Sequence, residues 1–74
     1  MRSIREIASE IETDWTKVNF AARPYLDAMY SLDSVSDSYG LDSGQSVVAY
    51  FLANAGAWRG EKARAIKAEL KAML

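Results

Sequence analysis

The side chains that could carry chemistry in this chain are carboxylates and lysines, because it has neither histidine nor cysteine. Enzymes usually need a group that titrates near neutral pH, and carboxylate pairs are the main remaining source of one. Glu6 and Glu10 form such a pair, but their spacing places them on the solvent face of a helix. The sequence contains no glycine-rich phosphate loop and no nucleophile elbow. We therefore expect no catalytic residue and no enzymatic activity.

The segment that begins at Asp33 is comparable with a calcium-binding loop, because Asp33 and Asp37 occupy its first and fifth positions. The other positions do not fit. Val35 stands at the third position, Ser38 replaces the glycine of the sharp turn, and Gly44 replaces the bidentate glutamate. We expect an ordinary polar connection there, with no metal site and no cofactor.

Charge is distributed unevenly along a chain whose net charge is −1. Residues 1–25 carry four basic and four acidic side chains, residues 26–57 carry four acidic and no basic ones, and residues 58–74 carry five basic and two acidic ones. The simplest explanation places the acidic middle segment near a basic C-terminal helix. A functional polarity is the alternative.

Three of these bases, Arg64, Lys67 and Lys71, fall along one flank of the expected C-terminal helix. Like charges four residues apart destabilise a helix, so something should offset them: acidic residues 33–42, the helix dipole, a protein partner or a phosphate backbone. The three bases are the candidate nucleic-acid contacts. A net-acidic domain gives such binding only a weak electrostatic basis, so nucleic acid is the alternative partner.

Trp58 and Arg59 are candidate protein contacts, because Trp and Arg are common among interface hot spots. The structural alternative has Trp58 closing one end of the core and Arg59 pairing with an acid. Ala65, Ala68 and Ala72 form a smooth outer strip on the last helix, which helical propensity alone also explains. If the strip is an interface, another protein or a second copy of this domain could occupy it.

The element that organises the chain is the apolar run of residues 47–58, VVAYFLANAGAW. It is apolar around most of the helical circumference, which predicts a buried helix. We expect four helices in one domain, an all-α compact bundle with the third helix central and buried, at residues 4–13, 21–32, 43–55 and 59–73.

Local signals set the ends of these helices. Ser3 and Glu6 match a capping box, and Asp42 with Gln45 is expected to form another at the third helix. Gly56 is expected to end that helix in a left-handed conformation. The preceding loop should turn Val35, Tyr39 and Leu41 inward.

The segments SIREIA, DW, PYLDAM, DSYG, VVAYFLANAGAWRG and IKAEL together resemble a group of short all-helical proteins from phages and integrative elements of Gram-positive gut bacteria. The resemblance covers nearly the whole chain. It implies an accessory protein of a mobile element, of the kind that binds a host or phage protein. The group has no assigned activity, so no functional residue is carried over from it.

The N-terminus has no uninterrupted apolar segment of the signal-peptide type, and the apolar run at residues 47–58 is too short to span a bilayer. We therefore expect a cytoplasmic protein without membrane contact. We expect it to be a non-catalytic protein-binding accessory module, with self-association as one form of that binding. A small nucleic-acid-binding protein is the alternative.

Overall fold

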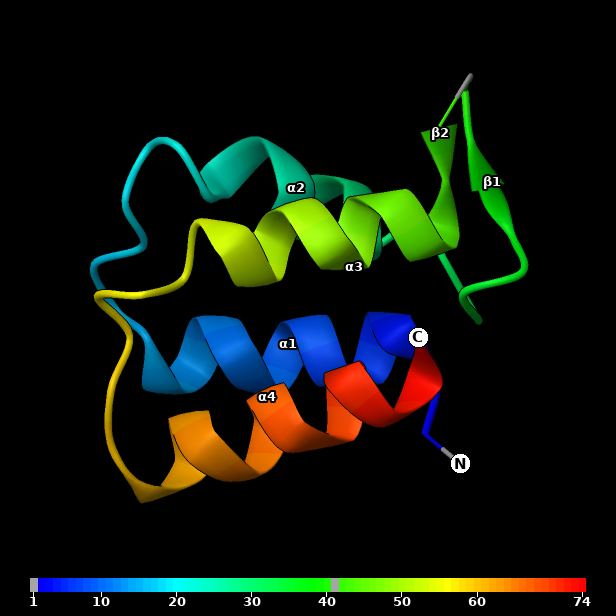
Figure 1. Ribbon diagram of the computed structural model, residues 1–74. Helices are drawn as coiled ribbons and strands as arrows, with labels where there is room; N and C mark the ends of the chain where they lie inside the picture. Colours follow the sequence, from blue (N-terminus) through cyan, green and yellow to red (C-terminus); the bar gives the residue numbers. More distant parts are fainter. Residues whose placement is uncertain (1, 41) are drawn as a thin grey trace.

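The computed structural model describes residues 2–40 and 42–74, and it confirms the expected all-α class, with a short hairpin added (Figure 1). The elements in chain order are α1 (Ile4–Asp14), α2 (Arg23–Met29), β1 (Ser38–Tyr39), β2 (Asp42–Ser43), α3 (Gly44–Ala53) and α4 (Glu61–Met73).

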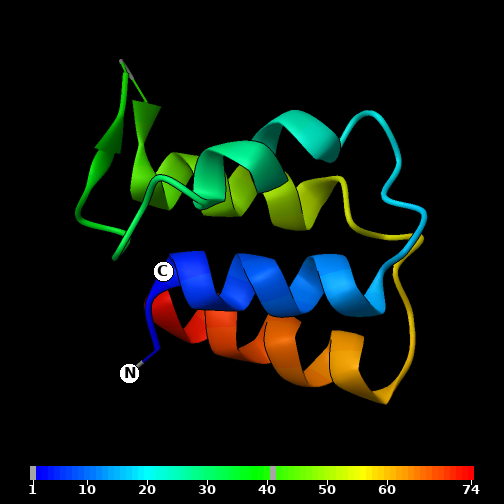
Figure 2. The same cartoon turned by 180° about the vertical axis from the view of Figure 1, so that it is seen from behind.

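The four helices form two layers that lie against each other. Figures 1 and 2 show α1 beside α4 in one layer and α2 beside α3 in the other. The main contacts join α1 to α2, α2 to α3, α3 to α4 and α4 to α1. The helices are therefore arranged as a ring around a shared core, in which each one packs chiefly on two neighbours.

The third helix, α3, was expected to be central and buried, and the structure shows one face of it in the core. Gly44, Val47, Val48 and Phe51 of α3 are buried, but the opposite face, which includes Tyr50, is exposed. Much of that exposed face is alanine, whose small side chain costs little to leave in water. The apolar run is thus one large buried face with a back of small residues.

Helix α1 forms where its sequence predicts. The hydroxyl of Ser3 accepts the amide of Glu6, whose carboxylate accepts the Ser3 amide in return, so the capping box is present. The apolar residues recur at helical spacing and are all buried: Ile4, Ile7, Ala8 and Ile11.

Helix α2 is shorter than the predicted 21–32. It begins only at Arg23, next to Pro24, because the side chain of Asn19 accepts the Ala22 amide and holds the preceding turn. After Met29 the chain continues in turns closed by backbone hydrogen bonds between residues three positions apart, and Leu32 at their end is still buried.

The start of α3 depends on a close approach between two backbone segments. The amide of Gly44 donates to the Asp37 carbonyl at 2.6 Å, and a Cβ at Gly44 would lie 2.8 Å from the Ser34 carbonyl oxygen. The Asp37 carboxylate in turn accepts the amides of Asp33 and Ser34. The connection is therefore a defined structure that anchors α3.

Both predicted ends of the third helix need correction. Ser43, and not Asp42, is the cap, since its hydroxyl accepts the Ser46 amide; Gln45 donates its side-chain amide to the Leu74 carbonyl instead of completing a capping box. The helix ends at Ala53.

Glycine also behaves differently from the prediction. Gly56 is not in the left-handed region, whereas Gly40 in the hairpin and Gly60 before α4 have φ of 62° and 118°. Val35 packs partly buried against the core, while the Tyr39 side chain and Leu41 lie outside the described residues.

Ion pairs join the two helices of the lower layer in Figure 1. The guanidinium of Arg2 contacts Glu69 of α4 at 2.6 Å and also binds Glu10 of α1, which lies 3.7 Å from the ammonium of Lys62. The hydrogen bonds from Arg2 lower the pKa of the Glu69 carboxyl. Arg2 therefore connects α4 to α1 at the end of the bundle where the chain begins.

We predict that Gly44→Ala destabilises the fold by about 1–3 kcal/mol, because the new methyl group would overlap backbone carbonyls that cannot move independently. Gly56→Ala is the matched control, since a Cβ there meets nothing within 4 Å. Urea denaturation would measure both. Equal stability of the two variants would contradict the close approach.

We predict that Glu69→Gln lowers stability near pH 7, by about 1 kcal/mol or less for a partly exposed pair, and has little effect near pH 3. Because folding lowers the Glu69 pKa, its contribution is present above the pKa of the unfolded chain and is lost as pH falls through the folded pKa. Thermal melts across pH measure this. The difference should vanish in an Arg2→Gln background.

Candidate functional site

Three aromatic rings close one end of the core. Trp58 stacks on Trp15 with 5.8 Å between ring centroids and 7° between planes, and the edge of Phe51 packs against both. The indole N–H of Trp58 donates to a carboxylate oxygen of Asp14 at 2.8 Å. These contacts tie the end of α1 to α3 and to the connection before α4.

Trp58 is a core residue, and its side chain is not a contact surface. Only 2% of the residue is exposed, and its one polar group is already bonded to Asp14. The structural alternative for Trp58, closure of the core, is therefore the correct one. This burial could not be predicted from the position of Trp58 after a helix, because the ring that covers it belongs to Trp15, 43 residues earlier in the chain.

Arg59 differs from its neighbour, because it is exposed and has no ion pair with the acids of residues 2–40 and 42–74. It lines a pocket of about 340 Å³ at the start of α4. We name this the basic pocket; its lining residues are Trp58, Arg59, Gly60, Ala63, Arg64 and Lys67. Three of them are cations and none is acidic.

Lys67 is the cation whose position is most tightly fixed. Its ammonium donates to the carbonyl oxygens of Ala55 at 2.8 Å and Trp58 at 2.6 Å, and it lies 5.8 Å from the centroid of the Trp58 ring. Burial lowers the pKa of Lys67, and the charges of Lys71 and Arg59 lower it further. Backbone carbonyls therefore hold a lysine that has two positive side chains, Lys71 and Arg59, near it.

The acidic middle segment does not neutralise this lysine or its neighbours. Asp33 pairs with Arg5 at 3.0 Å, Asp27 pairs with Arg23, and the Asp37 carboxylate accepts backbone amides. The expected pairing of residues 33–42 with the basic side of α4 is thus wrong. The reason is geometric, since the hairpin lies in the other layer, beyond the start of α3 (Figure 1).

Eight of the nine bases of the protein fall into two groups, and the ninth, Lys17, is exposed in the loop between α1 and α2. Arg2, Arg5, Arg23 and Lys62 are all in ion pairs with carboxylates. In the part of the chain that the structure describes, four bases just before α4 or on one side of it form no ion pair: Arg59, Arg64, Lys67 and Lys71. We name these four the basic flank. Arg64 and Lys71 are exposed, and the N-terminal end of the α4 dipole has the same sign.

The alanine strip lies where the spacing predicts. Ala65, Ala68 and Ala72 are exposed on α4, opposite the buried Ile66 and Leu70. The structure thus brings the candidate residues together in part: Arg59, Arg64 and Lys67 share a pocket, and the alanines lie along the adjacent outer face.

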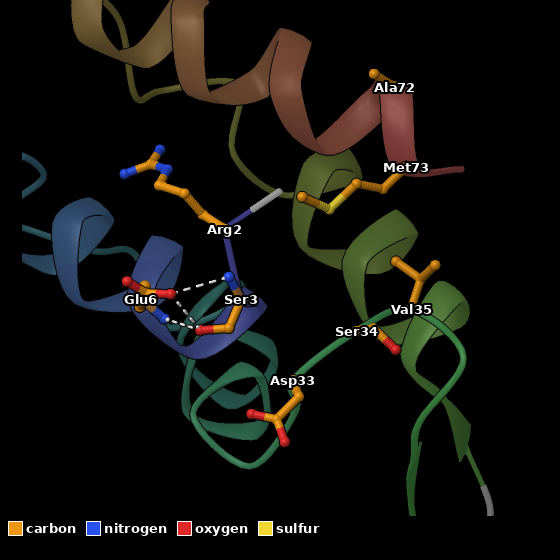
Figure 3. Close-up of a pocket in the computed structure, with 8 residues that line it drawn as sticks. All are labelled: Arg2, Ser3, Glu6, Asp33, Ser34, Val35, Ala72 and Met73. Carbon is orange, nitrogen blue, oxygen red and sulfur yellow. Dashed lines mark hydrogen bonds between the residues drawn. The ribbon is translucent and has the colours of Figure 1, made fainter.

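A second pocket, of about 420 Å³, lies at the opposite end of α4 between the start of α1 and the turn after α2. Figure 3 shows Val35 and Met73 on its apolar side, and the guanidinium of Arg2 turned away from both. Its charged residues already have partners: Arg2 binds Glu69, Asp33 binds Arg5, and Glu6 accepts Ser3. The pocket can receive an apolar group, but its charges select no ligand.

Phe20 is an exposed aromatic side chain that was not among the predicted contact residues. Its residue is 90% exposed. The loop around it is nevertheless held in place, since Asn19 donates to the Asn54 carbonyl and accepts the Ala22 amide. Tyr50 is also 53% exposed and stacks on Tyr25. A sequence signal for Phe20 existed: the residues three and four positions away on either side are not large and apolar (Thr16, Lys17, Arg23 and Pro24).

No protein-family model, curated protein or solved structure matches the chain. Within residues 2–40 and 42–74, no cluster of three or more acidic side chains is placed to hold a metal ion. None of the helices there is long and apolar enough to cross a membrane. The feature of the described residues that could bind a ligand is therefore the basic flank, whose cations would attract a negatively charged group.

Proposed function

We propose that the protein is a non-catalytic binding module that recognises an acidic protein partner through α4. The contact surface consists of the exposed members of the basic flank, Arg59, Arg64 and Lys71, together with the alanine strip. The observation that carries this proposal is the basic flank itself, whose cations form no ion pair within the described chain.

The distribution of the other charges supports an external partner. Four of the other five bases are paired, so the fold has enough carboxylates to neutralise bases where their positions match. The alanine strip would let the backbone of a partner helix approach closely while Arg64 and Lys71 reach its acidic side chains. Complementary charge of this kind mainly sets the association rate and the choice of partner.

A protein partner fits better than nucleic acid for two reasons. The domain has a net charge of −1, and the four bases of the basic flank are few for a phosphate backbone, where affinity rises with the number of phosphates that are neutralised. The resemblance to proteins of phages and integrative elements favours a cytoplasmic host or phage protein. A second copy is the other candidate, since the exposed alanine strip of one copy could pack against that of another.

We predict that reversing two charges, Arg64→Glu with Lys71→Glu, weakens partner binding by about tenfold or more, which corresponds to about 1.4 kcal/mol or more. Immobilised protein would be exposed to a bacterial lysate and the bound proteins quantified by mass spectrometry. Lys17→Glu is the matched control, since Lys17 is exposed in the loop between α1 and α2 and lies outside the basic flank.

We expect wild type and Lys17→Glu to recover acidic proteins that the charge-reversed variant does not recover. Equal recovery by all three would contradict the proposal, and loss in Phe20→Ser instead would move the interface to the loop before α2.

Sedimentation of wild type and Ala68→Glu tests self-association: a larger mass that falls in the variant identifies a second copy as the partner. Salt-dependent binding of duplex DNA would favour nucleic acid.

A further inference from the structure

The basic pocket has features that the outer face of α4 lacks. It is a concave site of about 340 Å³, and its cations come from two segments, with Arg59 from the connection before α4 and Arg64 and Lys67 from the helix. Its other lining residues, Trp58, Gly60 and Ala63, carry no side-chain charge. The walls of the pocket therefore carry positive charge alone.

The donors of these cations are not all used inside the protein. The Lys67 ammonium has three N–H groups, and two of them are bonded to carbonyl oxygens. Arg59 and Arg64 make no ion pair, and neither has a side-chain hydrogen bond to the rest of the described chain. Planar guanidinium groups match the oxygens of phosphate with paired hydrogen bonds. The unused donors therefore suit a compact oxyanion.

Charge and shape distinguish a phosphate group from the other anions. Three cations match a dianion better than a single carboxylate. A nucleotide base would need an aromatic face to stack on, but the Trp58 ring is covered by Trp15 and Lys67. Burial, and then the charges of Lys71 and Arg59, lower the pKa of Lys67, and a bound anion would oppose the effect of those two charges.

We propose that the basic pocket binds the phosphate group of a phosphate monoester, through Arg59, Arg64 and Lys67. This inference rests on the proposed function, since it names the group that the acidic partner presents: a phosphorylated side chain. Free phosphate carries the same chemistry, and the experiment separates the two sources.

The first experiment titrates the ¹⁵N-labelled protein with inorganic phosphate at constant ionic strength and pH and follows backbone and arginine side-chain signals. We predict saturable shifts for residues that line the basic pocket, and binding that is about tenfold weaker in Arg64→Gln, the loss expected for a charged hydrogen bond. Lys17→Gln is the control, since Lys17 is exposed in the loop between α1 and α2 and does not line the pocket. Acetate should shift the same signals at least about tenfold more weakly, because it carries one charge.

The second experiment identifies the source of the phosphate by comparing a phosphoserine peptide, its unphosphorylated form and inorganic phosphate. Tighter binding of the phosphopeptide than of either other probe supports a phosphorylated protein partner. Equal affinity for the phosphopeptide and for inorganic phosphate would overturn the phosphorylated side chain and leave free phosphate as the ligand.

Unsaturable shifts, or shifts that Arg64→Gln leaves unchanged, would overturn the site altogether. The proposed function would still stand if the charge-reversed variant nevertheless lost its protein partner. If phosphate binds but the charge-reversed variant recovers the same proteins as wild type, the proposed function is overturned and the phosphate site in the basic pocket still stands. The two failures are therefore distinguishable.

Discussion

The contact on which the rest of the structure depends is the stack of Trp15 on Trp58, with the edge of Phe51 against both rings. It joins residues that follow α1, belong to α3 and precede α4, so it fixes how the two layers meet at one end of the bundle. Buried aromatic pairs contribute large apolar areas and a preferred geometry. A domain of 74 residues without a disulfide depends strongly on such a contact.

The same contact determines where positive charge gathers. Once the Trp58 ring is buried, the backbone from Ala55 to Trp58 turns two carbonyl oxygens toward Lys67, and Arg59 is left outside the core. The ammonium of Lys67, a residue of α4, is thus held by the connection between α3 and α4, and the charges of Arg59 and Lys71 lower its pKa further. The arrangement that completes the core therefore also produces the basic pocket.

The sequence predicted the parts of the fold that depend on local spacing, and missed those that depend on tertiary contacts. Ile4, Ile7 and Ile11 with the Ser3 capping box located α1, since period and cap are local properties. The alanine-rich back of α3 looked buried because an apolar pattern does not distinguish small exposed side chains from core ones. The Trp15–Trp58 stack and the bonds of Lys67 to carbonyls could not be predicted, because each joins segments whose meeting depends on the whole fold. The candidate residues of α4 were found, but the grouping of Arg59 with Arg64 and Lys67 in one pocket was not.

Burial of the Trp58 indole is tested directly by hydrogen exchange at its N–H, followed by NMR in deuterated buffer. If Trp58 is the core residue that connects α1, α3 and α4, its indole proton, bonded to Asp14, should be strongly protected and exchange only when the domain unfolds. Exchange at the rate of an exposed indole in the folded protein would contradict this. It would return Trp58 to the surface and remove the basis for the position of Lys67 and for the basic pocket.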